Sequence, residues 1–154
     1  LYEQYIREGK ISVVSTENEA ISLMRNLCRF YNVKYIMAFN SGFDMTKTKC
    51  RELLDEFEFI DIWLMALQTL THYKKFSKFC NEFELKNAKG NCLTNAQTMY
   101  AYITNNPDYI EEHTALADSL IEMEIFVSCL KTHKKFSKNV HCWDCKEKNK
   151  KFPK

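Results

Sequence analysis

His113 and Asp118 stand five positions apart near the end of the chain and could do chemistry together. A carboxylate is a ligand for hard cations, and an imidazole, which titrates near neutral pH, can take a proton from water. Five residues of continuous helix would turn the two side chains about 140° apart. They can therefore serve one site only if His113 lies in the turn that leads into the helix, and Pro107 with Asp108 favours such a start.

The helix that follows has to position Asp118. Apolar residues recur at helical spacing up to about Thr132, which predicts one buried stripe and places Glu122 and Glu124 on the solvent side. The predicted stripe consists of Leu116, Leu120, Met123, Val127 and Leu130.

Strands are predicted upstream of this helix. Residues 10–15 and 34–39 are rich in β-branched and apolar residues, and a helix over residues 16–31 separates them. Strand, helix and strand within about 30 residues predict a parallel βαβ unit. Residues 58–63 predict a further strand that ends at Asp61 and runs into a helix.

A second polar group follows the strand at residues 34–39. Asn40 and Asp44 come directly after it, at the carboxyl edge where ligands usually bind in parallel sheets. Gly42 is expected to let the backbone turn sharply, so that Phe43 packs inward. Alternatively, this segment is only a common polar turn.

Both groups match motifs of one family. The pattern His-x-Ala-Leu-x-Asp over residues 113–118 resembles the third motif of the DEDDh 3′–5′ exonucleases. Asn-Ser-Gly-Phe-Asp over residues 40–44 resembles their second motif, and the order of the two is the family's. The resemblance covers roughly residues 11–130. The sequence around residues 89–97 and 109–116 is most similar to phage-encoded members associated with DNA replication.

The resemblance implies a fold and a reaction. The fold is α/β and ribonuclease-H-like, with a helix-rich C-terminal half and with the family's N-terminal strands missing from this sequence. The reaction is metal-dependent hydrolysis from a single-stranded or frayed nucleic acid 3′ end, in proofreading or replication, beside a DNA polymerase or another replication protein. DNA is the expected polymer, although the sequence leaves RNA open.

The resemblance also implies roles for individual residues. Asp44 and Asp118 would be two of four carboxylates that hold two Mg²⁺ or Mn²⁺ ions, and His113 would be the catalytic base. Asn40 and Phe43 would bind the substrate. Asp61 would support the fold without binding metal.

The family's first motif, Asp-x-Glu on an opening strand, is absent from residues 1–43, which contain no aspartate. Glu17-Asn-Glu19 is the nearest imitation, but Thr16 and Glu19 have the spacing of a capping box. Two hypotheses follow. Either the first motif lies upstream in a longer exonuclease, so that residues 1–154 alone are inactive, or a catalytically degenerate nuclease fold serves as a binding or inhibitory module in a replication complex.

Size and composition indicate one folded domain, with 45% hydrophobic and 14% aromatic residues in 154. We expect an exonuclease-like domain over residues 1–132 and a basic tail over residues 133–154. No stretch approaches 18 apolar residues, and the start lacks a signal peptide's apolar core. We therefore expect no membrane partner and a cytoplasmic location, in the host cell if the chain is phage-encoded. An odd number of cysteines, seven, favours reduced thiols.

The tail differs in charge from the rest. Residues 131–154 carry nine lysines against two acidic residues, whereas residues 1–130 are acidic overall. Such an arm could contact nucleic acid phosphates, or it could simply be solvated. Cys142 and Cys145 form a Cys-x-x-Cys half-site that could bind Zn²⁺ together with His133 and His141, the alternative being free cysteines.

Overall fold

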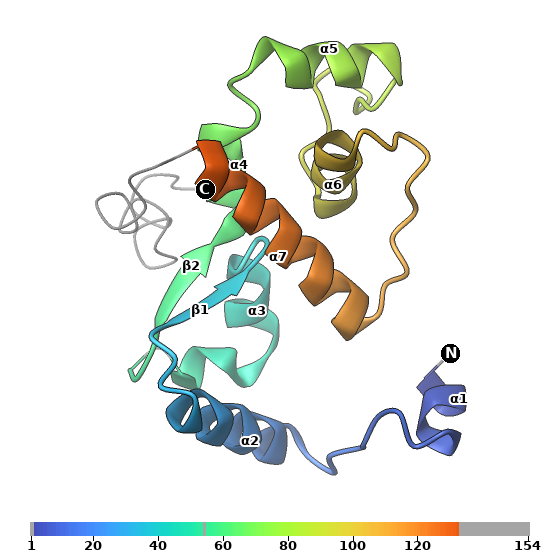
Figure 1. The fold of residues 1–154 in the computed structure, drawn as a ribbon. Helices are drawn as coiled ribbons and strands as arrows, with labels where there is room; N and C mark the ends of the chain where they lie inside the picture. Colours follow the sequence, from blue (N-terminus) through green and yellow to red (C-terminus); the bar gives the residue numbers. More distant parts are fainter. Residues whose placement is uncertain (1, 54, 133–154) are drawn as a thin grey trace.

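The computed structural model describes residues 2–53 and 55–132 and shows a helix-rich α/β chain with a two-stranded parallel sheet (Figure 1). The helical elements are α1 (Tyr2–Arg7), α2 (Glu17–Phe30), α3 (Gly42–Lys47), the 3-10 helix η1 (Lys49–Leu53), α4 (Ile62–Thr69), α5 (Lys74–Glu82), α6 (Ala96–Thr104) and α7 (Ala115–Thr132). The strands are β1 (Tyr35–Ala38) and β2 (Glu58–Asp61). The predicted tail domain and its zinc candidates, His133, His141, Cys142 and Cys145, lie outside the described residues.

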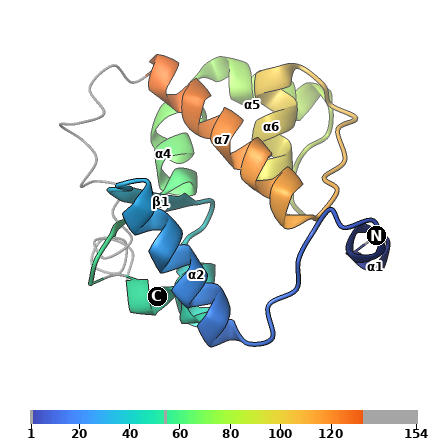
Figure 2. The same cartoon turned by 60° about the horizontal axis from the view of Figure 1, so that its bottom comes forward.

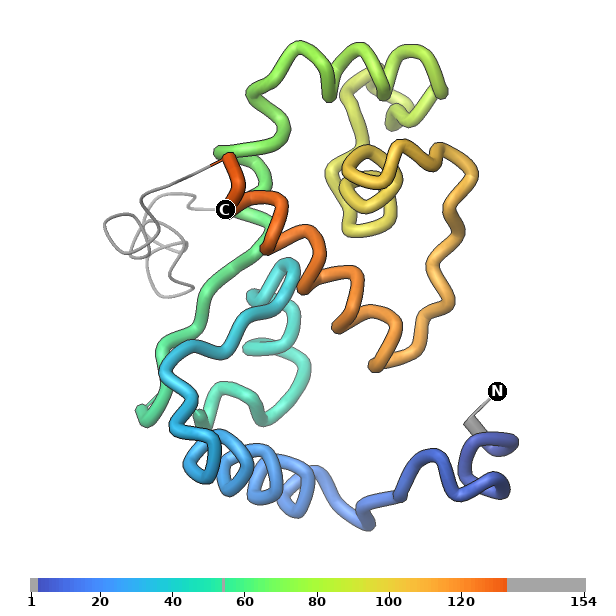
Figure 3. Tube along the Cα trace, viewed as in Figure 1, coloured from blue at the N-terminus to red at the C-terminus, as the bar shows by residue number. Residues whose placement is uncertain are grey.

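The sheet pairs β1 with β2 in parallel, and α3 and η1 lie in the connection between the two strands (Figures 1 and 3). Ala38 is opposite Asp61, so both strands end at the same edge. These two strands were predicted, but the strand over residues 10–15 was wrong. That segment joins α1 to α2 without regular structure and exposes Val13 and Val14, because β-branched residues form a strand only beside a partner.

The expected cap of α2 is confirmed. The Thr16 side chain accepts a hydrogen bond from the Glu19 amide at 3.2 Å, and Glu19 Oε2 accepts one from the Ser15 amide at 2.8 Å. Glu17 Oε1 in turn accepts a hydrogen bond from the Lys49 amide at 2.7 Å. Glu17 and Glu19, the residues nearest in pattern to Asp-x-Glu, are therefore both engaged in hydrogen bonds that hold α2 and the start of η1.

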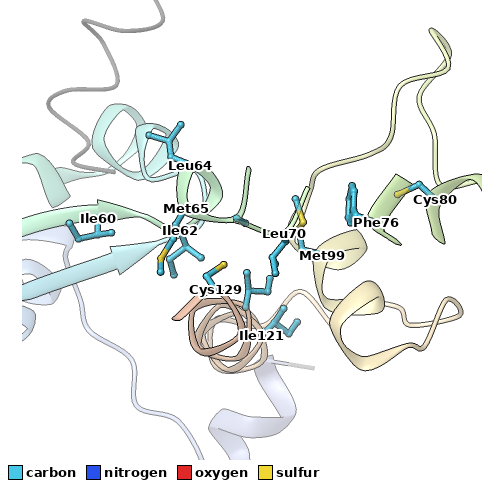
Figure 4. Packing of buried hydrophobic residues seen from close by; sticks show 12 residues of the cluster. Ile60, Ile62, Leu64, Met65, Leu70, Phe76, Cys80, Met99, Ile121 and Cys129 are labelled. Atoms are coloured by element: carbon cyan, nitrogen blue, oxygen red, sulfur yellow. The ribbon is translucent and has the colours of Figure 1, made fainter. Parts of the chain in front are cut away.

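Helix α7 packs along α4 and α6 and forms one side of the larger core (Figures 2 and 4). Ile121, Ile125 and Cys129 are its buried residues, and they meet Met65 of α4 and Met99 of α6 in one cluster. A smaller cluster joins α2 to the strand connection and consists of Ile21, Cys28, Met45, Leu53, Phe57 and Phe59. Met37 and Ile60 belong with the larger cluster and Ile36 and Phe59 with the smaller one, so the two clusters lie on opposite faces of the strands.

The predicted buried stripe of α7 was wrong. Leu116, Leu120, Met123 and Val127 are exposed, from 41% at Val127 to 72% at Leu116, and Leu130 is half-buried. The helix carries two apolar stripes, and the buried one is displaced by about one residue, or 100° of rotation. Periodicity alone does not decide which of two such stripes packs, so Glu122 moved from the predicted solvent side to a half-buried position.

The described helices include none that has both the length and the apolar character to cross a membrane.

Candidate functional site

The turn after β1 places Asn40, Phe43 and Asp44. The positive φ of this turn is at Asn40, with 61°, rather than at Gly42, and α3 then begins. The Phe43 amide donates to the Asn40 carbonyl at 2.8 Å. Contrary to the expected inward packing, Phe43 is 59% exposed, because α3 buries Met45, which lies about 200° around the helix from Phe43.

Asp61 ties the carboxyl ends of both strands together. Its side chain is buried, and Oδ1 accepts hydrogen bonds from the Asn40 amide at 3.2 Å, the Trp63 amide at 3.0 Å and the Leu64 amide at 3.4 Å. The last two amides belong to the first turn of α4, which Asp61 caps. Asp61 therefore has a structural task, in keeping with its expected role.

His113 lies in the turn that leads into α7, which is the arrangement that the sequence required. Thr114 caps the helix, because its Oγ1 accepts from the Ala117 amide at 3.2 Å and its carbonyl accepts from the Asp118 amide at 2.8 Å. His113 precedes this cap with a left-handed backbone, φ 55°. The imidazole therefore lies near Asp118 in the first turn of α7. In a continuous helix it would be rotated about 140° away from Asp118.

Glu111 joins these two residues and was missed by the sequence analysis. Single ligand atoms of Glu111, His113 and Asp118 all lie within 4.8 Å of one another, so this group could hold a metal ion. His113 Nδ1 lies 3.8 Å from Glu111 Oε2. The spacing Glu-x-His-x4-Asp was visible in the sequence, but only the fold of the loop showed that all three side chains meet.

Burial, more than any other cause, raises the pKa of the Glu111 carboxyl. The negative charge of Asp118 raises this pKa further, whereas His113 lowers it. The Glu111 backbone is held to α6, since its amide donates to Gln97 Oε1 at 3.4 Å. The ring of Tyr109 also packs on Tyr100 of α6, with 4.5 Å between ring centroids. The loop before α7 is therefore anchored where Glu111 enters the site.

Glu122 is the second carboxylate that the sequence analysis missed. Burial raises its pKa to about 7, and the charges of Asp44, Asp118 and Glu111 add to this rise. A hydrogen bond from the Phe39 amide works in the opposite direction and lowers the pKa. Glu122 is therefore close enough to Asp44, of the group after β1, and to Asp118, of the group with His113, for both charges to raise its pKa.

Burial also raises the pKa of Asp44, and the charge of Asp61 contributes to the same rise, although a hydrogen bond from its own backbone lowers it. A cavity of about 560 Å³ opens beside this carboxyl. Its lining consists of Phe39, Asn40, Phe43, Asp44, Trp63, Thr94, Asn95, Ala96 and Glu122. His113 and Asp118 are not part of this lining and form a neighbouring group with Glu111.

Comparisons with protein-family models, curated proteins and solved structures find no match to this chain. Oxygen donors from α3 and α7 line the cavity, and one nitrogen donor, that of His113, lies just before α7. Carboxylate oxygens and imidazole nitrogens are both ligands that metal ions take in proteins.

Replacing Glu122 by glutamine is expected to change how stability depends on pH. The folded pKa of about 7 lies above the unfolded value of 4.5, so between these pH values the folded chain binds more protons than the unfolded chain. Wild-type stability should therefore fall as pH rises from 4.5 to 7. At pH 8 the free energy of unfolding of Glu122→Gln should exceed that of wild type by on the order of 1 kcal/mol, after allowance for solvent screening. At pH 4 this gain should be absent.

The measurement is urea unfolding of both chains between pH 4 and 8. Glu124→Gln is the matched control, because Glu124 is exposed on the same helix and its substitution should leave the pH profile of wild type unchanged. Parallel profiles for wild type and Glu122→Gln would show that Glu122 does not carry the raised pKa.

Proposed function

We propose that this chain is part of a metal-dependent 3′–5′ exonuclease, with DNA as the expected polymer. One observation carries the proposal: the charges of Asp44, from the segment after β1, and of Asp118, from α7, act on the same Glu122 carboxyl. These two aspartates belong to the two motifs that resemble the DEDDh family. That resemblance implies that the two aspartates lie close together at the carboxyl edge of a parallel sheet, and their common effect on Glu122 supports this.

The residues of the site fit the chemistry of phosphodiester hydrolysis. Bound Mg²⁺ or Mn²⁺ would activate a water and stabilise the leaving 3′ oxygen. Asp44, Asp118 and Glu122 offer oxygen donors for such ions, and Asp118 Oδ1 is buried without a hydrogen-bond partner among the described residues. A buried carboxylate oxygen in that state is costly unless a cation or a donor meets it.

The neighbouring side chains suit a nucleic acid end. His113 is 78% exposed on its side chain, so its imidazole can take a proton from an attacking water and release it to solvent. The exposed ring of Phe43 can stack on a terminal base or sugar at the mouth of the cavity. Asn40 lines the same cavity and can hydrogen-bond to the terminal nucleotide.

A ribonuclease-H-like sheet would need a further strand beside β1. Within the described residues β1 pairs on one side only, and its four residues are half-buried. A cavity of about 270 Å³ separates it from α7 and is lined by Tyr35, Met37, Ile62, Ser119, Glu122, Met123 and Phe126. A strand bearing Asp-x-Glu in this place would set two more carboxylates close to Glu122. We propose that the first motif acts from there.

The second candidate is a catalytically degenerate nuclease fold that binds or inhibits within a replication complex. The observation that favours it is the engagement of Glu17 and Glu19 in backbone hydrogen bonds, which leaves residues 1–43 without a substitute for the first motif. Such a module would keep the fold and the polymer contacts but would not need metal.

Calorimetric titration with Mg²⁺ and Mn²⁺ separates the two candidates. We expect residues 1–154 to bind Mn²⁺, and Asp44→Ala to weaken binding at least about tenfold, or 1.4 kcal/mol. The control is Asp55→Ala, because Asp55 is an exposed carboxylate outside the site. Absence of binding in both wild type and Asp44→Ala would favour the degenerate module.

A further inference from the structure

The group Glu111, His113 and Asp118 differs in donor chemistry from the carboxylates around the cavity. It includes an imidazole nitrogen, and its ligand atoms lie within 4.8 Å of one another. Hard Mg²⁺ prefers oxygen ligands and keeps several waters, whereas Zn²⁺ and related transition ions accept mixed nitrogen and oxygen sets. The three side chains therefore suit another class of ion than the cavity does.

The two carboxylates of this group are held close despite their like charge. The Glu111 side chain is 16% exposed, and one of its carboxylate oxygens lies within 4.8 Å of a carboxylate oxygen of Asp118. The other oxygen of Asp118, Oδ1, is buried and has no hydrogen-bond partner among the described residues. An arrangement of this kind gains most from a cation, which offsets the two like charges and meets the unpaired oxygen.

The backbone holds these donors in place without an ion. The Thr114 cap fixes the first turn of α7 and with it Asp118. The bond to Gln97 fixes Glu111 against α6. Between them, His113 has a left-handed φ of 55°, a conformation that is uncommon for a non-glycine residue. Glu111 and His113, two residues apart, are thereby presented to the same point near Asp118.

We propose that Glu111, His113 and Asp118 form a mononuclear site for a transition-metal ion of the zinc class. Zinc bonds to histidine nitrogen and carboxylate oxygen are about 2.0–2.2 Å, which sets tetrahedral ligands roughly 3.4 Å apart. His113 Nδ1 and Glu111 Oε2 stand at 3.8 Å, and the exposed imidazole can close the difference by rotation. Water would complete the coordination.

Occupation of this site has a consequence that rests on the proposed function. An imidazole nitrogen bound to an ion has no lone pair left to take a proton from water. Asp118 would also be shared between this ion and the Mg²⁺ or Mn²⁺ of the cavity. A zinc-class ion at this site would therefore inhibit the exonuclease.

The test of the site uses Co²⁺, whose visible absorption reports coordination, on the full chain with Cys142→Ser and Cys145→Ser to remove the thiols of the tail. We expect one ion to bind, to be displaced by Zn²⁺ and to resist displacement by millimolar Mg²⁺. His113→Asn should weaken binding at least about tenfold, since asparagine tolerates a positive φ but has no imidazole. Glu111→Gln should weaken binding in the same way.

Glu112→Gln and His72→Ala remove exposed residues outside the group and should leave the affinity for Co²⁺ unchanged. Thermal unfolding monitored by circular dichroism checks that each variant is folded. Equal Co²⁺ affinity in wild type, His113→Asn and Glu111→Gln would overturn the site. Since Co²⁺ binding needs no hydrolysis, loss of the exonuclease assignment would show separately, as absence of Mg²⁺-dependent degradation by a chain that also carries an Asp-x-Glu strand.

Discussion

Replacing Asp118 by alanine is expected to abolish Mg²⁺-dependent degradation of an oligonucleotide, by on the order of 10³-fold or more, in a chain that also carries an Asp-x-Glu strand. Asp118 belongs to the group with Glu111 and His113, and its charge contributes to the raised pKa of Glu122. Its buried Oδ1 lacks a hydrogen-bond partner among the described residues. Its removal would take away a proposed metal ligand and the group beside His113, the proposed catalytic base. Release of nucleotides from a labelled 3′ end is the measurement.

Two comparisons make this result specific. Glu124→Ala removes an exposed carboxylate from the same helix and should leave the rate within about twofold of wild type. Residues 1–154 alone should not degrade DNA measurably, because half of the expected carboxylate ligands are missing. Activity of the Asp118→Ala variant would refute the assignment, and activity of residues 1–154 would refute the need for an upstream motif.

Replacing Asp61 by alanine is expected to lower the free energy of unfolding by about 3–5 kcal/mol. One carboxylate oxygen, Oδ1, accepts hydrogen bonds from the amides of Asn40, Trp63 and Leu64. The variant would leave these donors without their acceptor at a buried position. It would also uncap α4, which carries part of the larger core. Chemical unfolding followed by circular dichroism measures the loss.

Asp61→Asn is the matched variant for this prediction. It keeps a side-chain oxygen of the same reach and should lose no more than about 1–2 kcal/mol. Asp55→Ala, at an exposed position, should change stability by less than about 0.5 kcal/mol. If Asp61→Ala cost less than 1 kcal/mol, the carboxylate could not be what joins the two strand ends.

Local hydrogen bonding explains which parts of the fold were predictable. The start of α2 follows from Thr16 and Glu19, whose side chains meet backbone amides three and four residues away. Both strands of the sheet were predicted from short apolar runs, and β2 ends where expected, at Asp61. The helix start just after His113 likewise follows from residues next to it in the chain.

Tertiary contacts decided the features that the sequence left ambiguous. Residues 10–15 have strand composition but no neighbouring strand to pair with among the described residues, and they remain irregular. Helix α7 has two apolar stripes, and packing against α4 and α6 selected the one with Ile121, Ile125 and Cys129. The same rotation brought Glu122 toward Asp44.

The sequence by itself determined which residues could do chemistry and the order in which the chain presents them: Asp44 after a strand, then His113 and Asp118 around a helix start. Only the tertiary structure decided that Glu111 and Glu122 join them. The physical reason is that a carboxylate's surroundings belong to other segments of the chain. Burial and neighbouring charge, which set its pKa and its readiness to hold a cation, exist only after those segments have packed.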